Sequence, residues 1–264
     1  MRLFPFKTPL PLNEETRQRL HGAIAEHRLQ EFSQRHRLSL DHFLLRDSNG
    51  STAFHLAVGK GAIGEVASIL KTTGTPFSLE HCLLKDRSGR TLFHQAAQSG
   101  HLDRLAAILK ESGQSLSLDH LLVTDRDKRT ALHRAAWGGH LEQIAAVLRE
   151  SGQVLLPEHF LLNTYNHRTP LLLAGNNGHL EQVFSPALWL GRFPEMRRLW
   201  EHVPEKHRPQ VDFDRAAHET LLLSRHPLPR LGPQAFGAAR RPSPSFPETR
   251  GQNPGLFQGN PPAK

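Results

Sequence analysis

The chain has 264 residues, a hydrophobic content of 38% and a formal net charge of +8. No apolar run approaches the roughly 18 residues that a membrane-spanning helix needs, and prolines break the N-terminal stretch, which argues against membrane insertion and a signal peptide. One cysteine cannot form an intramolecular disulfide, so a cytoplasmic protein is expected.

The first region, residues 1–46, is expected to form a degenerate helical cap. Its segment 15–37 places Leu20, Ile24 and Leu29 at roughly helical spacing. A stack of repeats needs atypical end units because an end unit has only one neighbour to cover it.

The central region, residues 47–184, contains four gapless copies of one unit at a spacing of 39 residues. The copies are marked by recurring threonines and glycines, namely Thr52, Thr91, Thr130, Thr169, Gly61, Gly100, Gly139 and Gly178. Each threonine is a typical helix N-cap and each glycine a typical helix stop. A second helix with an aliphatic stripe follows each glycine, so every copy predicts two short antiparallel helices that bury their apolar faces only by stacking.

Residues 89–102 carry the pattern Gly-x-Thr-x-x-His-x-Ala-Ala-x-x-Gly-His-Leu, which resembles the ankyrin repeat. The resemblance implies an all-α solenoid with a β-turn finger ahead of each first helix. It also implies that His94 and His133 bond the neighbouring finger, and that the protein binds other proteins. Only the fourth copy has the family's proline, Pro170, and it replaces the family histidine by Leu172, which predicts a looser repeat.

The period of 39 exceeds the family's usual 33, and the extra residues recur as 38–45, 77–84, 116–123 and 155–162. Each contains a serine or proline near its start, Ser39, Ser78, Ser117 or Pro157, with an acidic residue one or two positions later, which favours a helix N-terminus. We therefore expect a third, one-turn helix in each repeat. Lengthened repeats of this kind are similar to those of secreted effectors of intracellular bacteria, which would act in the host cytoplasm or nucleus.

Two further regions follow the repeats. Residues 185–223 are predicted to form a C-terminal helical cap, because apolar side chains recur at helical spacing on either side of Pro194. Residues 224–264 are rich in proline and arginine and predict a disordered tail.

The sequence offers no catalytic, metal or cofactor motif, although it contains 18 histidines. Equivalent histidines are one repeat apart, about 8–10 Å, too far to share a zinc ion. Cys82 lies in an apolar run and is expected to be a small buried side chain rather than a nucleophile. We expect no enzyme activity and no small-molecule substrate.

Finger tips and the open side of each first helix are not fixed by packing, so they are the expected partner-binding residues on one concave face. The candidates are Arg87, Arg90, Gln95, Gln98, Arg126, Arg129, Arg134, Trp137, Asn176 and Asn177. Arg134 and Trp137 form the expected hot spot. Packing of Trp137 against a neighbouring repeat is the equally weighted alternative.

These patterns favour a non-catalytic scaffold that binds an acidic or polar surface of a partner protein. The alternative is a nucleic-acid or chromatin adaptor that uses the basic ends, because the excess of basic side chains lies outside residues 47–191.

Overall fold

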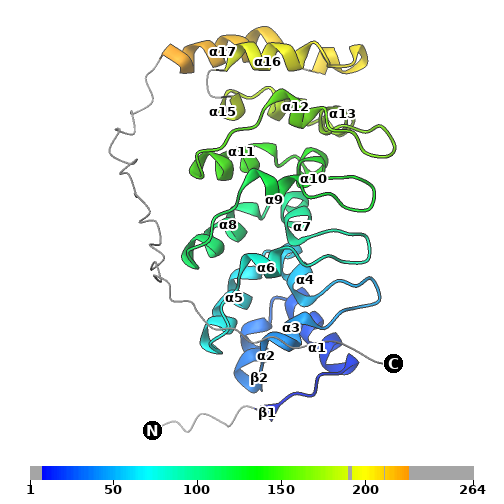
Figure 1. The fold of residues 1–264 in the computed structure, drawn as a ribbon, viewed down its shortest axis with the longest axis vertical. Helices are drawn as coiled ribbons and strands as arrows, with labels where there is room; N and C mark the ends of the chain where they lie inside the picture. Colours follow the sequence, from blue (N-terminus) through cyan, green and yellow to red (C-terminus); the bar gives the residue numbers. More distant parts are fainter. Residues whose placement is uncertain (1–7, 190–191, 211, 226–264) are drawn as a thin grey trace, which may run out of the picture. The chain divides into compact units, whose positions relative to one another are not determined.

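The computed structural model describes residues 8–189, 192–210 and 212–225, all within one unit, Met1–His226. Helix pairs stack in layers through this part of the chain, with finger loops along one side (Figure 1). The predicted all-α ankyrin-type solenoid is therefore confirmed. The described residues contain one two-stranded parallel pair, β1 (Thr8–Pro9) with β2 (His36–Arg37).

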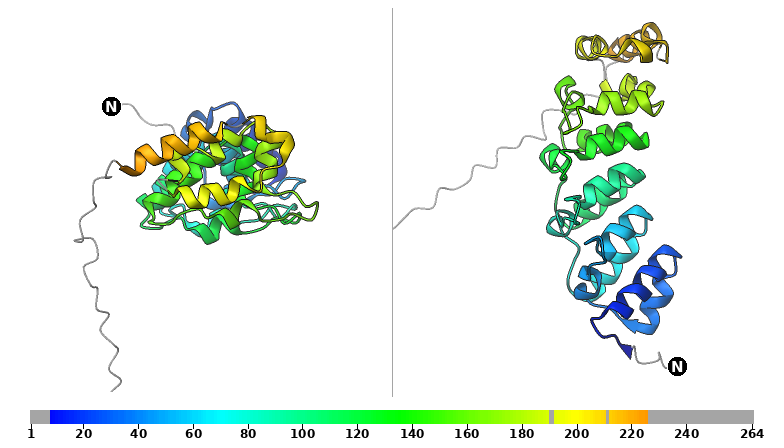
Figure 2. Two further views of the ribbon diagram at one scale, coloured as in Figure 1. Left: turned by 90° about the horizontal axis from the view of Figure 1, so that it is seen from above. Right: turned by 90° about the vertical axis from the view of Figure 1, so that its right-hand side faces the viewer.

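Each repeat contains an inner helix beside the fingers, an outer helix behind it and a short helix that leads to the next finger. The inner helices are α4 (Ala53–Gly59), α7 (Leu92–Ser99), α10 (Ala131–Gly138) and α13 (Pro170–Asn176). The outer helices are α5 (Ile63–Thr72), α8 (Leu102–Glu111), α11 (Leu141–Glu150) and α14 (Leu180–Val183). The predicted one-turn helices are α3 (Leu40–Leu44), α6 (Leu79–Cys82), α9 (Leu118–Leu122) and α12 (Pro157–Phe160). Two further views show the same succession of layers (Figure 2).

The inner helices begin at threonines and end at glycines for local reasons. The backbone N–H of Thr91 donates to Nδ1 of His94 at 3.2 Å, three residues into α7, which is a capping box with histidine in place of glutamate. Gly100 follows α7 with a left-handed φ of 70°, which a glycine adopts without steric strain. Ser78 and His81 repeat the box at α6. Histidines thus complete capping boxes in both the inner helices and the one-turn helices.

The core runs through the whole stack because small inner-helix residues let neighbouring layers approach. Ala96 and Ala135 are fully buried, as are the outer-helix residues Leu105 and Ile144. The short helices contribute larger side chains, including Phe43 and Phe160. Each layer therefore covers the apolar face of the one before it, as a solenoid requires.

Both ends of the stack are helical. The N-terminal end contains α1 (Glu14–Ala25) and α2 (Leu29–Arg35), and the other end contains α15 (Pro186–Trp189), α16 (Phe193–Trp200), the 3-10 helix η1 (Glu205–Gln210) and α17 (Phe213–Arg225). The fourth outer helix, α14, is only one turn long, in agreement with a looser last repeat. Helix α17 extends to Arg225 and so includes the first two residues of the predicted tail, and residues 226–264 lie outside the described part.

Candidate partner-binding surface

The fingers are rigid turns because an aspartate closes each of the first three. Asp86 Oδ1 accepts from the backbone N–H groups of Ser88 and Arg90 at 2.8 and 2.9 Å, and Asp125 repeats this with Asp127 and Arg129. Backbone bonds then join successive fingers, for example Arg126 N–H to Ser88 O at 2.9 Å. Side chains on the fingers are consequently held at fixed spacing.

Three buried histidines, one on each of the first three inner helices, bond these helices to the segments that follow them. Nε2 of His55 lies 3.2 Å from Arg90 O, Nε2 of His94 lies 3.0 Å from Arg129 O, and Nε2 of His133 lies 3.0 Å from Leu162 O. The predicted bond from His94 to the neighbouring finger is confirmed. His133 bonds Leu162 O, two residues after α12, and also the backbone of Arg168 in the fourth finger. Because Nδ1 already accepts a backbone N–H, the ring is neutral with its proton on Nε2. Burial lowers the pKa of His133 to about 4, and this effect outweighs the bonds to backbone carbonyls, which raise the pKa.

Most of the predicted surface residues are accessible. Arg87, Arg126, Trp137, Asn176 and Asn177 are exposed, with 46% of Trp137 accessible. Arg90, Gln95, Gln98 and Arg129 are half-buried. We call these nine residues together with Arg168 the finger face. The exposure of Trp137 shows that its ring is not enclosed between repeats.

The expected exposure of Arg134 is wrong, because only 6% of this residue is accessible. Its guanidinium donates from Nη2 to Asp125 Oδ2 at 2.8 Å, a buried ion pair within the third repeat. Burial of Asp125 raises the pKa of its carboxyl, but the bonds from Arg134 and from the backbone N–H of Arg129 outweigh this and lower it. Arg134 therefore supports the finger rather than presenting a free side chain.

Five of the predicted residues surround one pocket of about 220 Å³ between α10 and α13. Its walls are Arg129, His133, Arg134, Trp137, Arg168, Leu173, Asn176 and Asn177. Arg168 and Leu173 were not among the predicted residues. The sequence does contain a signal for Arg168, since Arg90, Arg129 and Arg168 recur at the 39-residue spacing just before the threonine caps.

Comparison with known families agrees with the geometry. Residues 93–148, from α7 to the end of the apolar stripe of α11, match the model of ankyrin repeats (many copies). The chain contains ankyrin repeats. A search of curated proteins finds no match. Ankyrin repeats indicate a protein–protein interaction module, and the finger face lies on the matched repeats and the one that follows.

The other predicted residues of the ankyrin surface lie outside the pocket. Arg90 is neutralised by Asp86, with Nη2 and Oδ2 2.7 Å apart. The Arg87 guanidinium donates to the backbone oxygen of Ser48 in the preceding finger. Gln98 Oε1 is 3.5 Å from Nη1 of Arg134. The structure therefore divides the predicted residues into a pocket and a flanking row of finger residues.

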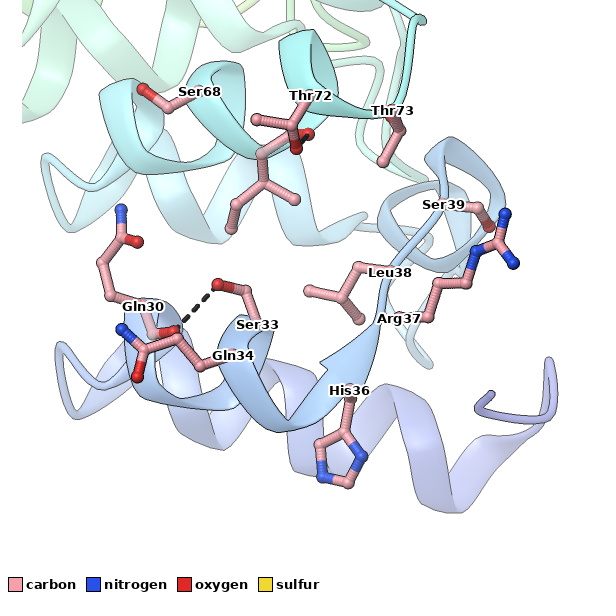
Figure 3. Close-up of a pocket in the computed structure, with 11 residues that line it drawn as sticks. Gln30, Ser33, Gln34, His36, Arg37, Leu38, Ser39, Ser68, Thr72 and Thr73 are labelled. Carbon is pink, nitrogen blue, oxygen red and sulfur yellow. Dashed lines mark hydrogen bonds between the residues drawn. The ribbon is translucent and has the colours of Figure 1, made fainter. Parts of the chain in front are cut away.

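A larger cavity, about 730 Å³, lies away from the fingers between α2 and α5 (Figure 3). Its walls are mostly neutral polar side chains, among them Gln30, Ser33 and Thr72, with Leu38 at its inner end. Later ankyrin repeats bridge this position: Ser112 Oγ donates to Phe77 O and Gln114 Oε1 accepts from Leu79 N–H. Thr73 instead bonds Leu70 O in its own repeat. A smaller cavity of about 500 Å³ lies at the equivalent junction between α5 and α8, where the bridge from Ser112 to Phe77 is present. The unbridged junction between the cap and the first repeat is thus the one with the larger cavity.

Two features of the described residues concern metal-binding and nucleophilic groups. No group of three or more His, Cys, Asp or Glu side chains among them could hold a metal ion. Cys82 is fully buried, as predicted, and burial raises the pKa of its thiol, which disfavours the nucleophilic thiolate. Within the same part of the chain, no helix combines the length and apolar character needed to cross a bilayer.

Proposed function

We propose that this ankyrin repeat protein is a non-catalytic scaffold that binds a partner protein through the finger face. The observation that carries the proposal is Trp137, an indole that is 46% exposed on a helix whose opposite side is fully packed. Tryptophan and arginine dominate binding energies at protein interfaces. Here Trp137 shares a pocket with Arg129 and Arg168, which supports a hot spot at this position.

The surface around Trp137 is preorganised, which favours binding because little ordering is needed on association. Asp125 holds the third finger through two backbone N–H groups, and Arg134 holds Asp125 in turn. The Lys128 ammonium lies 4.6 Å from the ring centre of Tyr165 in the next finger, joining the two tips. A rigid, partly aromatic and basic surface suits an acidic or polar partner surface.

Affinity purification with wild type, Trp137→Ala and Val154→Ala tests this proposal. Val154 is a matched control because it is 45% exposed and lies outside the finger face. We expect Trp137→Ala to lose the partner, with a drop in affinity of about 30-fold for a hot spot of about 2 kcal/mol, while Val154→Ala retains it. Both melting temperatures should stay near that of wild type. A stable Trp137→Ala protein that still captures the partner contradicts the proposal.

Two narrower predictions stay predictions: delivery as an effector into a host cell, and nucleic-acid binding through the basic ends. The second is tested by salt titration of polynucleotide binding with the chain and with a version lacking residues 224–264. A steep dependence of the binding constant on salt that disappears with the deletion would support it.

A further inference from the structure

Within the described part of the chain, the pocket beside Trp137 has an arginine without an acidic partner, whereas the equivalent arginines of the second and third repeats are paired with aspartates. The finger arginine of the second repeat, Arg90, pairs with Asp86. Arg129 in the third repeat pairs with Asp127 at 3.1 Å. In the fourth repeat, threonine and asparagine occupy the positions of these acids, Thr164 and Asn166. Among the described residues, no carboxylate lies within ion-pair distance of Arg168.

The pocket exists because the fourth inner helix carries shorter side chains than the third. At the 39-residue spacing, Leu173 replaces Arg134 and Asn176 replaces Trp137. Leu173 has no charged group with which to extend toward the third repeat as Arg134 extends toward Gln98. Space therefore remains over Arg134 and Trp137, with Arg129 and Arg168 at its edge.

A buried donor in the wall of this pocket has no partner. Nη2 of Arg134 bonds Asp125, but Nε of the same guanidinium is buried without an acceptor among the described residues. A buried polar group without a partner is unfavourable, by roughly 1–3 kcal/mol for a neutral group and more for a charged one. An acceptor brought by a ligand would relieve this, directly or through water.

The remaining polar walls also favour an acceptor. Asn176 Oδ1 lies 3.1 Å from Nε2 of His207, and Asn177 Nδ2 donates to Leu173 O at 2.8 Å. The amide nitrogen of Asn176 has no acceptor among the described residues and is the group left to meet a ligand. No acidic side chain lines the pocket. Its three guanidinium groups face two carboxylates, Asp125 and Asp127, so one positive charge is left over.

We propose that this pocket binds one acidic side chain, glutamate or aspartate, of the partner protein. This rests on the proposed function and names the chemistry that the finger face recognises. The volume of about 220 Å³ lies below the roughly 300–1,000 Å³ of pockets for whole small molecules, which fits a single side chain. A carboxylate neutralises Arg168 and the Trp137 ring covers the methylene groups that carry it.

Peptide titration followed by NMR tests the pocket without a known partner. The probes are two blocked tripeptides, acetyl-Ala-Glu-Ala-amide and its glutamine counterpart, and inorganic phosphate. The readout is the indole N–H signal of Trp137 in the full chain, assigned by its loss in Trp137→Phe. We expect the glutamate peptide to shift this signal saturably and to bind about tenfold more tightly than the glutamine peptide, because charge-assisted bonds are about twice as strong as neutral ones.

Arginine variants identify the group responsible. Arg168→Ala and the size-preserving Arg168→Gln should each weaken glutamate-peptide binding about tenfold, as expected for one lost charge-assisted bond. Arg197→Ala removes the same charge from an exposed residue of α16, outside both the pocket and the finger face, and should leave binding unchanged. Because Arg168 and Arg197 are both exposed, all three variants should unfold at the wild-type denaturant concentration.

Several results would overturn the proposal. Equal binding of the glutamate and glutamine peptides would remove the charge preference, and equal losses in the Arg168 and Arg197 variants would remove the site. Tighter binding of phosphate than of the glutamate peptide would reassign the pocket to a phosphate group. Failure of the scaffold proposal gives a different result. If partner capture depends on Trp137 but not on Arg168, only the acidic-side-chain pocket is refuted. If partner capture is unchanged in Trp137→Ala, the scaffold proposal itself is refuted.

Discussion

The junction between the second and third ankyrin repeats differs from the junction between the third and fourth at a few equivalent positions. In the former, an arginine on the later inner helix, Arg134, reaches its own finger and the glutamine of the preceding helix. In the latter, Leu173 stands in that place and the finger aspartate becomes Thr164. The backbone hardly changes, since finger-to-finger bonds persist in both. Side chains at repeated positions therefore decide whether a junction is closed or open to a partner.

The opposite side of the stack gives the same comparison at its N-terminal end. Ser112 with Gln114, and Ser151 with Gln153, tie the second and third repeats to the ones before them. Thr73 and Thr75 occupy the equivalent positions in the first repeat and make no such bonds to the cap. The open cavity between α2 and α5 lies at this junction (Figure 3). At this end, loss of polar bridges thus accompanies a larger cavity, since one of about 500 Å³ remains between α5 and α8, where the bridge is present.

The largest expected effect comes from breaking the closed junction at Arg134. Arg134→Leu leaves Asp125 buried without its ion-pair partner, and removal of one member of a buried pair typically destabilises by about 3–5 kcal/mol. Urea unfolding followed by circular dichroism measures the loss. The double variant Asp125→Thr with Arg134→Leu copies the fourth repeat and should recover more than half of it, because no unpaired charge remains.

The double variant also tests the comparison itself. Thr164 Oγ1 accepts from the backbone N–H of Arg168 at 3.0 Å, so threonine preserves part of the finger turn. A double variant no more stable than Arg134→Leu alone would mean that Asp125 matters as a turn residue and not as an ion-pair partner. The closed and open junctions would then differ for a reason other than charge.

The second effect is a dependence of stability on pH to which the capping-box histidines of the first three inner helices contribute. Burial lowers the pKa of His55, His94 and His133 below the ordinary histidine value of about 6.5, so folding favours the neutral ring. Stability is fully present above pH 6.5 and falls as the pH drops toward the value of about 4 for His133. This residue alone should contribute about 2–4 kcal/mol to the loss.

His133→Gln tests that contribution. Glutamine can complete the capping box but does not titrate, so the variant should be less stable at pH 7 and show a shallower decline between pH 6.5 and 4. The fourth repeat has Leu172 at this position and therefore no titrating group in its capping box. If the stability of the variant declined with pH as steeply as that of wild type, burial in the fold would not be what keeps His133 neutral.

Much of this architecture was readable from the sequence because it depends on local signals repeated in register. Thr91, His94 and Gly100 specify one helix by capping and by a left-handed stop, and the same signals predict the next. The burial of Arg134 was not readable. It depends on a bond to Asp125, nine residues earlier, which a surface pattern does not reveal. The pocket could not be predicted from the sequence either, because it forms where Leu173 lacks the charged group that Arg134 has at the equivalent position.

The smallest expected effect closes the open N-terminal junction. Thr75→Gln places an amide where Gln114 and Gln153 accept from the backbone N–H groups of Leu79 and Leu118. A similar bond to Leu40 should raise the free energy of unfolding by about 1 kcal/mol, the usual net contribution of a hydrogen bond. Ser115→Gln, in an exposed position one residue after Gln114, is a control for the amide itself. If both variants gain equally, the added amide and not the bridge accounts for the gain, and the missing bond does not explain why this cavity is larger than the one of about 500 Å³ between α5 and α8.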